Sequence, residues 1–154
     1  MNLNKPKLFQ SSIKNVQFGK NVKIVEPVNL YDCIIGDNVF IGPFTEIQKD
    51  VVIGNNTTIS SHSFICSGVK IGNECFIAHG IMFTNDKFDW AENNKINWIQ
   101  RNTTIGNNVK IGSNSTILPI KIGDNVIIGA GSVVTKDISD NLTIFGNPAK
   151  IYKK

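Results

Sequence analysis

The sequence predicts an all-β solenoid of short parallel strands, and two patterns of side chains carry this prediction. Large apolar residues occupy every sixth position from Ile35 to Phe83 without a slip. The fourth residue after each is small or β-branched in most repeats, as at Val39, Thr45 and Ser63. A fixed period of six fits neither an α-helix nor a lone alternating strand. We therefore expect each six to form one strand and one corner, with three sixes closing a triangular coil of 18 residues.

The solenoid is expected to fill a single domain that ends in a less regular segment on each side. Residues 1–17 are expected to be irregular, residues 18–139 to form the coils, and residues 140–154 to form a tail. A loop at about 85–102 interrupts the coils after Thr84. Because the repeat resumes beyond this loop, we expect the loop to project from one continuous β-helix.

Two short steps fix where the corners fall. The spacing drops from six residues to five between Leu30 and Ile35, and again between Ile117 and Ile122. In a coil of three sides, both steps fall at the same corner. Stacking then predicts columns of inward side chains, such as that of Ile35 and Ile53, with coils about 4.8 Å apart.

Glycine and Asx residues explain how the chain turns at the corners. These residues adopt positive φ angles more readily than others do. They recur together between successive apolar positions, in Gly36-Asp37-Asn38, Gly54-Asn55-Asn56, Gly106-Asn107-Asn108 and Gly123-Asp124-Asn125.

Composition places few further limits on the protein. The net charge of +4 is modest and dispersed, which suits anionic small molecules and gives little support for nucleic-acid binding. Cys33, Cys66 and Cys75 form no CxxC pair and no closed disulfide set, as expected in a reducing cytosol. The chain has neither a signal-peptide core at its start nor an apolar run of about 18 residues. We therefore expect a soluble, cytoplasmic protein without a membrane or nucleic-acid partner.

Polar residues that depart from the repeat are the candidates for chemistry. The only two histidines, His62 and His79, are 17 residues apart and so fall on successive coils of one face. Glu46 and Gln48 lie one coil below His62, and Asn85 stands where the chain leaves the coils. The register predicts that these five side chains line one edge, with His79 as the natural general base.

The repeat resembles the hexapeptide-repeat acyltransferases, whose motif is Leu/Ile/Val-Gly-x-x-small-x, over roughly residues 18–150. This resemblance implies a left-handed parallel β-helix. It also implies a homotrimer with active sites between the subunits.

The end of the chain is similar to the closing signature of the coenzyme A-dependent members, in the runs Gly129–Ile138 and Gly146–Lys150. In those proteins the pantetheine arm runs along the coil edges and hydrogen-bonds the backbone. Small residues permit such an approach, and lysines meet phosphates as point charges. The resemblance thus implies acetyl-coenzyme A as co-substrate, bound by Ala130, Gly131, Lys136, Pro148 and Lys150.

The middle of the chain resembles one branch of the family, in the runs Glu46–Lys49, Ser61–Cys66 and His79–Asp86. That branch contains N-acetyltransferases of nucleotide-linked amino sugars for bacterial surface polysaccharides such as O-antigen. The nearest likeness is to enzymes that acetylate dTDP-3-amino-3,6-dideoxyglucose or its galacto epimer. For an acceptor of this kind we expect His79 and Asn85 to be catalytic or orienting residues. We expect Glu46, Gln48 and His62 to contact the sugar, and Asp86 also to bind the substrate.

Three alternatives remain open from the sequence. The first is an N-acetyltransferase of a related group, which acts on UDP-linked 3-amino sugars. The second is an O-acetyltransferase, whose acceptor is a hydroxyl group. A non-catalytic scaffold would keep the solenoid without binding coenzyme A. A zinc site like that of the γ-class carbonic anhydrases needs three histidines, and this chain has two, so no metal is expected.

Overall fold

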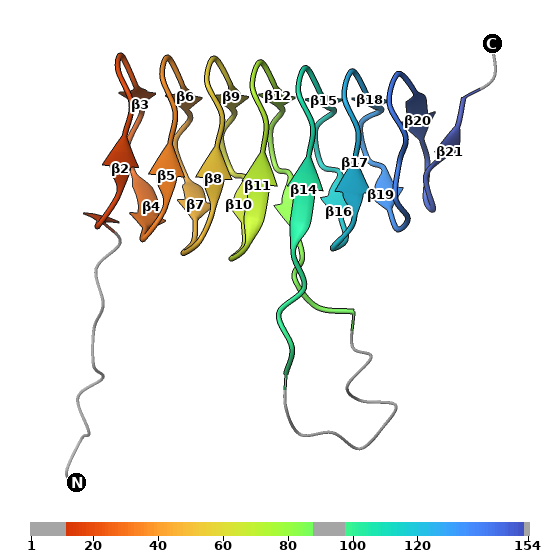
Figure 1. Cartoon of the computed structure of the whole chain (residues 1–154), viewed down its shortest axis with the longest axis horizontal. Helices are drawn as coiled ribbons and strands as arrows, with labels where there is room; N and C mark the ends of the chain where they lie inside the picture. Colours follow the sequence, from red (N-terminus) through yellow and green to blue (C-terminus); the bar gives the residue numbers. More distant parts are fainter. Residues whose placement is uncertain (1–11, 88–97, 153–154) are drawn as a thin grey trace, which may run out of the picture.

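The computed structural model describes residues 12–87 and 98–152, and in these residues every regular element is a short β-strand. The strands follow one another around a triangular coil, and the coils stack along one axis (Figure 1). The predicted all-β parallel β-helix is therefore confirmed. The described residues include no helix long and apolar enough to cross a membrane.

Three sheets form the sides of the triangle, and each takes every third strand. Sheet A contains β1 (Ile13–Lys14), β4 (Val28–Tyr31), β7 (Thr45–Ile47), β10 (Phe64–Ile65), β13 (Met82–Phe83), β16 (Thr116–Ile117) and β19 (Val133–Val134). Sheet B contains β2 (Gln17–Phe18), β5 (Ile34–Ile35), β8 (Val52–Ile53), β11 (Val69–Ile71), β14 (Thr103–Ile105) and β17 (Lys121–Ile122). Sheet C contains β3 (Lys23–Ile24), β6 (Phe40–Ile41), β9 (Thr58–Ile59), β12 (Phe76–Ile77), β15 (Lys110–Ile111), β18 (Ile127–Ile128), β20 (Thr143–Phe145) and β21 (Lys150–Ile151).

The pairing is parallel throughout except at the end of the chain, where β21 runs antiparallel to β20. Ile35, Ile53 and Ile71 are partners across sheet B, and Ile41 and Ile59 are partners across sheet C. The predicted columns are thus present. Coils of 18 residues follow from the unbroken sixes.

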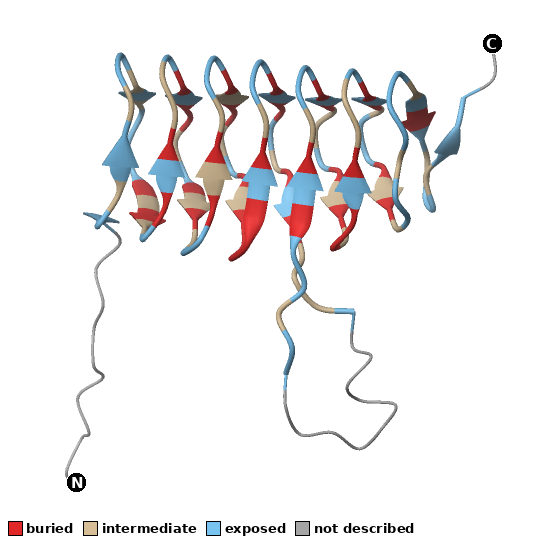
Figure 2. Cartoon of the chain, viewed as in Figure 1, coloured by how far each residue is buried: buried red, intermediate tan, exposed pale blue. Residues whose placement is uncertain are grey.

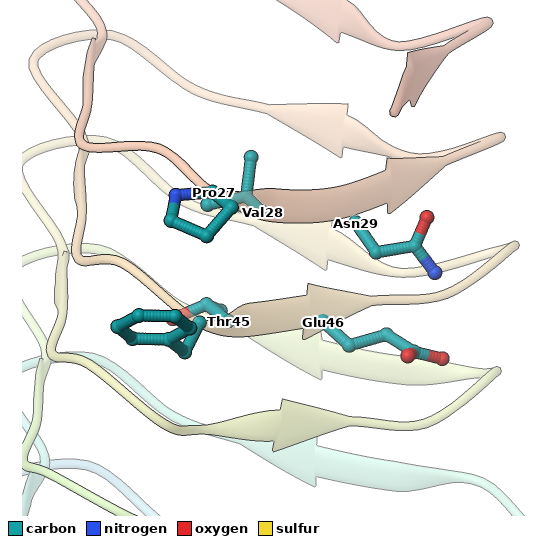
Figure 3. A pocket seen from close by; sticks show the side chains of 6 residues that line it. Pro27, Val28, Asn29, Thr45 and Glu46 are labelled. Carbon is teal, nitrogen blue, oxygen red and sulfur yellow. The ribbon is translucent and has the colours of Figure 1, made fainter. Parts of the chain in front are cut away.

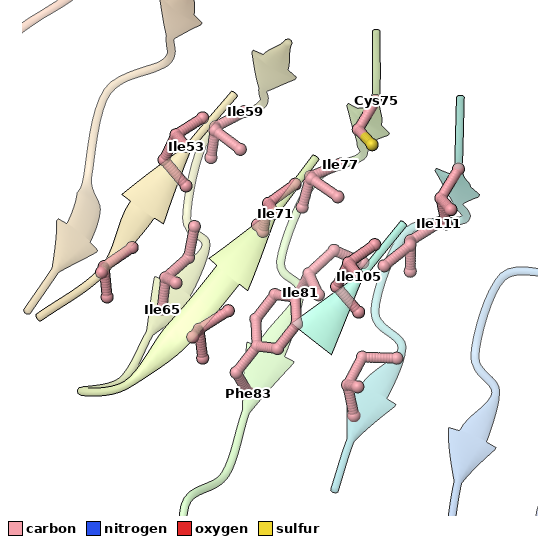
Figure 4. Packing of buried hydrophobic residues seen from close by; sticks show 14 of the residues in the cluster. Ile53, Ile59, Ile65, Ile71, Cys75, Ile77, Ile81, Phe83, Ile105 and Ile111 are labelled. Atoms are coloured by element: carbon pink, nitrogen blue, oxygen red, sulfur yellow. The ribbon is translucent and has the colours of Figure 1, made fainter. Parts of the chain in front are cut away.

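The core is the interior of the triangle. Every apolar sixth position from Ile35 to Phe83 is at most 3% exposed, and these side chains stack on one another from coil to coil (Figure 4). Small polar side chains fill the places between them, such as Thr45, Ser63 and Ser115. The turns and the outward faces carry the exposed residues (Figure 2). One axial column of large apolar side chains on each side, most of them isoleucine, therefore holds the sheets together.

Each corner of the triangle has its own character. We name the turn from sheet C to sheet A the His corner, since it carries His62 and His79. The turn from sheet A to sheet B is the loop corner, and the turn from sheet B to sheet C is the Asn corner. Both five-residue steps fall at the loop corner, as predicted, because they join sheet A to sheet B at Leu30–Ile35 and Ile117–Ile122.

The interruption after Thr84 also leaves from the loop corner (Figure 1). At its base the Arg101 N–H donates to the Asn85 carbonyl at 2.9 Å, and sheet B resumes at Thr103. The coils begin earlier than expected, since β1 forms within the segment 1–17 that we predicted to be irregular, and β2 begins at the last residue of that segment.

Candidate functional site

The His corner stacks five turns whose register is fixed by backbone hydrogen bonds. The N–H groups of His62, Gly80 and Gly131 donate to the carbonyls of Pro43, Ser61 and Ser113, at 3.0, 3.0 and 2.8 Å. The Asn114 N–H donates in the same way to the His79 carbonyl at 2.9 Å. Two neighbouring columns of residues result. One contains Pro43, Ser61, His79, Ser113 and Ala130, and the other contains Phe44, His62, Gly80, Asn114 and Gly131.

His79 is exposed at this corner and is held by the coil below it. The Ser61 Oγ lies 2.9 Å from the His79 Nδ1, across one turn of the solenoid. A contact to one ring nitrogen fixes the imidazole orientation and leaves Nε2 directed away from the serine. Ser61 was not among the predicted site residues, although its position 18 residues before His79 in an 18-residue coil is the signal for this contact.

Phe44 and His62 are bulky residues at positions of their column where the backbone has positive φ. All five residues of this column have positive φ, near 59° at Phe44 and 62° at His62, where higher coils have Gly80, Asn114 and Gly131. A bulky side chain is unfavourable in this region of φ and ψ. The two rings stack with their centroids 4.8 Å apart, and Phe44 is 59% exposed. Bulky residues kept in a strained backbone and left exposed are typical of functional positions.

The edge changes its character at His79. Toward the C-terminal end one column presents the small residues Ser113 and Ala130, and the other presents Asn114 and Gly131. The closing segment covers the same end, since the Ser132 Oγ accepts from the Gly146 N–H at 3.2 Å and the Ala149 N–H donates to the Val133 carbonyl at 2.8 Å. Pro148 therefore belongs to a segment that is bound to Ser132 and Val133, directly after the turn at Ala130 and Gly131. These three of the residues expected to bind coenzyme A thus lie at the same end of the solenoid.

The two lysines expected to bind coenzyme A, Lys150 and Lys136, lie at different places in the fold. Lys150 is exposed in β21, at the end of sheet C, where it pairs with Phe145. Lys136 is exposed two residues after β19, at the loop corner. Of the two lysines, Lys150 belongs to the closing segment that carries Pro148.

Glu46 projects from the outer face of sheet A and is held in place by its neighbours. The Gln48 Nε2 donates to the Glu46 Oε1 at 2.8 Å, and the Gln48 Oε1 accepts from both the N–H and the hydroxyl of Ser67 at 3.2 Å. Burial raises the pKa of Tyr31, and the nearby carboxylates of Glu46 and Asp32 raise it further. Glu46 is thus a pre-oriented carboxylate on a partly buried face.

Asn85 and Asp86 lie at the loop corner and are half-buried. They line an apolar pocket of about 610 Å³, together with Phe64 and Leu118 from the neighbouring coils and with Lys87, which follows Asp86. The residues from Gly80 to Thr84 separate Asn85 from His79 along sheet A. At about 3.3 Å per residue, the six steps from His79 to Asn85 span at most roughly 20 Å.

The prediction that five polar residues share one edge is therefore corrected. His62 and His79 lie at the His corner, Glu46 lies on the face of sheet A, and Gln48 and Asn85 lie at the loop corner. The sequence register placed each residue in its coil. The register did not show on which side of a two-residue strand each residue lies. Asn85 follows strand β13, whereas His79 precedes it, so Asn85 lies at the next corner.

The part of the chain that the structure describes contains no group of three or more His, Cys, Asp or Glu side chains arranged to hold a metal ion. All three cysteines are buried as free thiols. Burial raises the pKa of Cys33 and of Cys66 to about 11, and raises that of Cys75. These thiols are structural rather than nucleophilic.

Two family models match the chain, one on each side of the loop. The model described as bacterial transferase hexapeptide (six repeats) matches residues 32–67, and the hexapeptide repeat of succinyl-transferase matches residues 102–136. With the stacked coils, these matches define a hexapeptide-repeat β-helix.

Curated relatives agree with this class over parts of their length. The chain is 54% identical over 52 residues to galactoside O-acetyltransferase of Escherichia coli, covering 33% of this chain and 26% of the relative. It is 36% identical over 101 residues to chloramphenicol acetyltransferase of Klebsiella aerogenes, covering 52% and 48%. It is 32% identical over 151 residues to the bifunctional protein GlmU of Streptococcus uberis, covering 92% and 32%. The chain thus spans less than half the length of these relatives.

Solved structures match the whole fold. A mutant of AntD, an N-acyltransferase from Bacillus cereus in complex with dTDP and coenzyme A, superposes with a TM-score of 0.81 at 25% identity, covering 89% of this chain and 82% of AntD. A hexapeptide-repeat acetyltransferase from Vibrio cholerae in complex with acetyl-coenzyme A shares the fold, with a TM-score of 0.62 at 21% identity, covering 82% and 69%. The chain thus shares its repeat and its fold with the hexapeptide-repeat acyltransferases.

Proposed function

We propose that this chain transfers the acetyl group of acetyl-coenzyme A to the amine of a nucleotide-linked amino sugar. The acceptor is dTDP-3-amino-3,6-dideoxyglucose or its galacto epimer, and the product serves bacterial surface polysaccharide synthesis in the cytoplasm. The similarity to AntD, which was solved with dTDP and coenzyme A, supports both the nucleotide and the cofactor.

The observation that carries the proposal is the position of His79 on its edge. Its ring is exposed, and Ser61 contacts Nδ1 at 2.9 Å. Ser113, Ala130 and Gly131 lie on one side of it along the corner, together with Asn114, and Phe44 and His62 lie on the other. The small side leaves room for an extended pantetheine arm beside the backbone, with Ala130, Gly131 and Pro148 along it. The thioester would then reach His79 from the C-terminal end and the acceptor from the N-terminal end.

The proposed reaction is a direct acetyl transfer that needs one proton to be moved from nitrogen to sulfur. The sugar nitrogen attacks the thioester carbonyl carbon, the new C–N bond forms, and the C–S bond breaks. The nitrogen loses one proton, and the departing sulfur gains one. If His79 Nδ1–H donates to the Ser61 Oγ, Nε2 holds a free lone pair that can accept the amine proton and pass it to sulfur. Holding amine and thioester together supplies much of the remaining acceleration.

The distance between the two proposed catalytic groups supports a site completed by a second chain. His79 and Asn85 are separated by a strand of sheet A, so one acetyl group cannot contact both within one subunit. We propose a homotrimer in which the His corner of one subunit faces the loop corner of its neighbour. Asn85, Asp86 and Lys136 would then approach the acceptor and cofactor from the neighbouring chain, while Lys150 stays with the closing segment near the coenzyme A phosphates.

A hydroxyl acceptor is the second candidate, and a specific observation favours it. The identity to galactoside O-acetyltransferase is high, although it covers a third of this chain. A hydroxyl must lose its proton to become a nucleophile, so an O-acetyltransferase depends on its base more strongly than an N-acetyltransferase does.

Release of free thiol from acetyl-coenzyme A tests the proposal. The acceptors are the two dTDP-linked 3-amino sugars, a UDP-linked 3-amino sugar, and a galactoside as the hydroxyl acceptor. We expect turnover with a dTDP-linked amine and a partial loss of it in His79→Ala. Turnover with the galactoside alone, abolished in His79→Ala, would support the hydroxyl acceptor instead. Coenzyme A that fails to raise the melting temperature would point to a non-catalytic scaffold.

A further inference from the structure

A pocket on the N-terminal side of His79 has no role in the proposed transfer itself. It lies on the outer face of sheet A between the turns of two successive coils and has a volume of about 260 Å³. Its lining consists of Pro27, Val28, Asn29, Phe44, Thr45 and Glu46. Figure 3 shows Asn29 and Glu46 projecting from neighbouring strands at one end, with Pro27 at the other.

The two ends of the pocket differ in chemistry. The apolar end contains Pro27 and the exposed ring of Phe44, which His62 supports from the coil above by stacking at 4.8 Å. An exposed ring that is held rigidly from behind is a platform for another planar group. The polar end contains the Glu46 carboxylate, oriented by Gln48, and the Asn29 side chain. Such a pocket fits a flat heterocycle with hydrogen-bonding groups on one edge.

The Glu46 carboxylate decides which heterocycle fits. An ionised carboxylate only accepts hydrogen bonds, so its partner must donate one. The Oδ1 atom of Asn29 accepts from the Ser12 N–H at 3.4 Å, which directs Nδ2 toward acceptors. The pair therefore complements a ring N–H beside a carbonyl oxygen. Thymine and uracil have this arrangement at N3 and its flanking carbonyls, whereas the ring nitrogen of cytosine at this position has no hydrogen.

The pocket lies at a suitable height along the solenoid. Phe44 is two coils below Gly80, the neighbour of His79, and Pro27 is one coil further. At about 4.8 Å per coil this places the pocket roughly 10–14 Å from the acetyl-transfer level. A hexose joined to an extended diphosphate covers a comparable length. His62 lies between the two levels, where the diphosphate would pass.

We infer that the groove between Pro27 and Phe44, with Asn29 and Glu46 at its polar end, binds the pyrimidine base of the nucleotide-linked acceptor and selects a base with a ring N–H. This inference rests on the proposed function, because it assigns the nucleotide end of the same acceptor. It gives Glu46 contact with the base, whereas the sequence analysis expected contact with the sugar.

Calorimetric titration of the full chain with dTDP, UDP, CDP and GDP tests this assignment. We expect dTDP and UDP to bind at least about tenfold more tightly than CDP, since a hydrogen bond to a charged group is involved. Glu46→Gln should remove most of that preference, because an amide can turn its NH₂ toward the ring nitrogen of cytosine. Phe44→Gly, which suits the positive φ at this position, should weaken all four nucleotides by about tenfold or more through lost stacking. Glu74→Gln at the distant Asn corner is the matched control, and should change none of these affinities.

Two results would overturn the inference. One is equal affinity for dTDP and CDP, and the other is dTDP binding that is unchanged in both Glu46→Gln and Phe44→Gly. Because these nucleotides carry no amine, the titration is independent of acetyl transfer. If dTDP binds as expected but no acceptor is acetylated, the proposed function fails and the base site stands. If free amino sugars are acetylated while no nucleotide binds, the base site fails and acetyl transfer stands.

Discussion

The Ser61 hydroxyl and the His79 imidazole meet across one turn of the solenoid, with the Ser61 Oγ 2.9 Å from Nδ1. The contact joins residues 18 positions apart, and so it exists because this part of the β-helix keeps an unbroken period of six. The repeat thus does more than stack a core. It brings a fixed hydrogen-bonding group under an exposed histidine.

Removal of this hydroxyl should reduce turnover more than substrate binding. In Ser61→Ala we expect kcat to fall about tenfold or more, since His79 loses its orientation, while KM changes little. Ser61→Thr retains a hydroxyl and should recover much of the rate. Ser139→Ala, at an exposed serine beyond the last coil of sheet A, serves as the control. Equal kcat in Ser61→Ala and the wild type would show that the contact does not position the histidine.

Mixed oligomers test whether one site uses two chains. His79→Ala and Asn85→Ala should each lower activity when they are expressed alone. When the two variants are co-expressed and combine at random, about a quarter of the sites should pair an intact His79 with an intact Asn85 from the neighbour. Activity should therefore rise above that of either variant. Mixed oligomers no more active than the separate variants would contradict a site shared between chains.

The Asn corner offers a stability test that is independent of function. Asn side chains in successive coils donate to one another there, as from Asn38 to Asn56 at 3.0 Å and from Asn108 to Asn125 at 2.9 Å. Glu74 occupies this column between Asn56 and Asn108, with φ near 58°. Glu74→Asn should raise the free energy of unfolding by roughly 1 kcal/mol, because Asn tolerates this backbone better. Chemical denaturation measures the change, and a loss of stability would contradict the account of the corner.

The buried thiols predict how stability changes at high pH. In the unfolded chain these thiols ionise with their ordinary pKa near 9.0, whereas burial raises the pKa of Cys33 and Cys66 to about 11 in the folded chain. The folded state therefore keeps these protons in a range where the unfolded state loses them. Stability should be full below pH 9 and should fall as pH rises from 9 toward 11. Denaturation of Cys66→Ala against the wild type at pH 7 and 10 should show a smaller pH-dependent loss in the variant, and an equal loss would contradict this explanation.

Much of the fold could be predicted from the sequence because one period determines it. The strict sixes fixed the coils, the columns and the corner that takes both short steps. The start of the solenoid could not be predicted, since Ile13 and Gln17 do not continue the pattern of the sixes. Their strands form through pairing with β4 and β5.

The site could be predicted in part. Register alone placed His62 and His79 on successive coils, and the closing signature put Ala130, Gly131 and Pro148 at one end. The register could not show that Asn85 lies across sheet A from His79. The repeat does not reveal where a two-residue strand begins and ends, so it does not show which corner a nearby residue occupies. Ser61 and Phe44 were missed for another reason. A serine and a phenylalanine inside a repeat look ordinary until the backbone shows a contact or a strained φ.

The most direct test of the central claim compares two acceptors that differ only in the nucleophile. The chain is incubated with acetyl-coenzyme A and dTDP-3-amino-3,6-dideoxyglucose, or with the matching dTDP sugar that carries a hydroxyl at the same carbon. Thiol release and mass spectrometry of the sugar product are followed together. We predict stoichiometric thiol release and an N-acetylated sugar with the amine, and little turnover with the hydroxyl. Acetylation of the hydroxyl sugar alone, or thiol release with neither, would contradict the account.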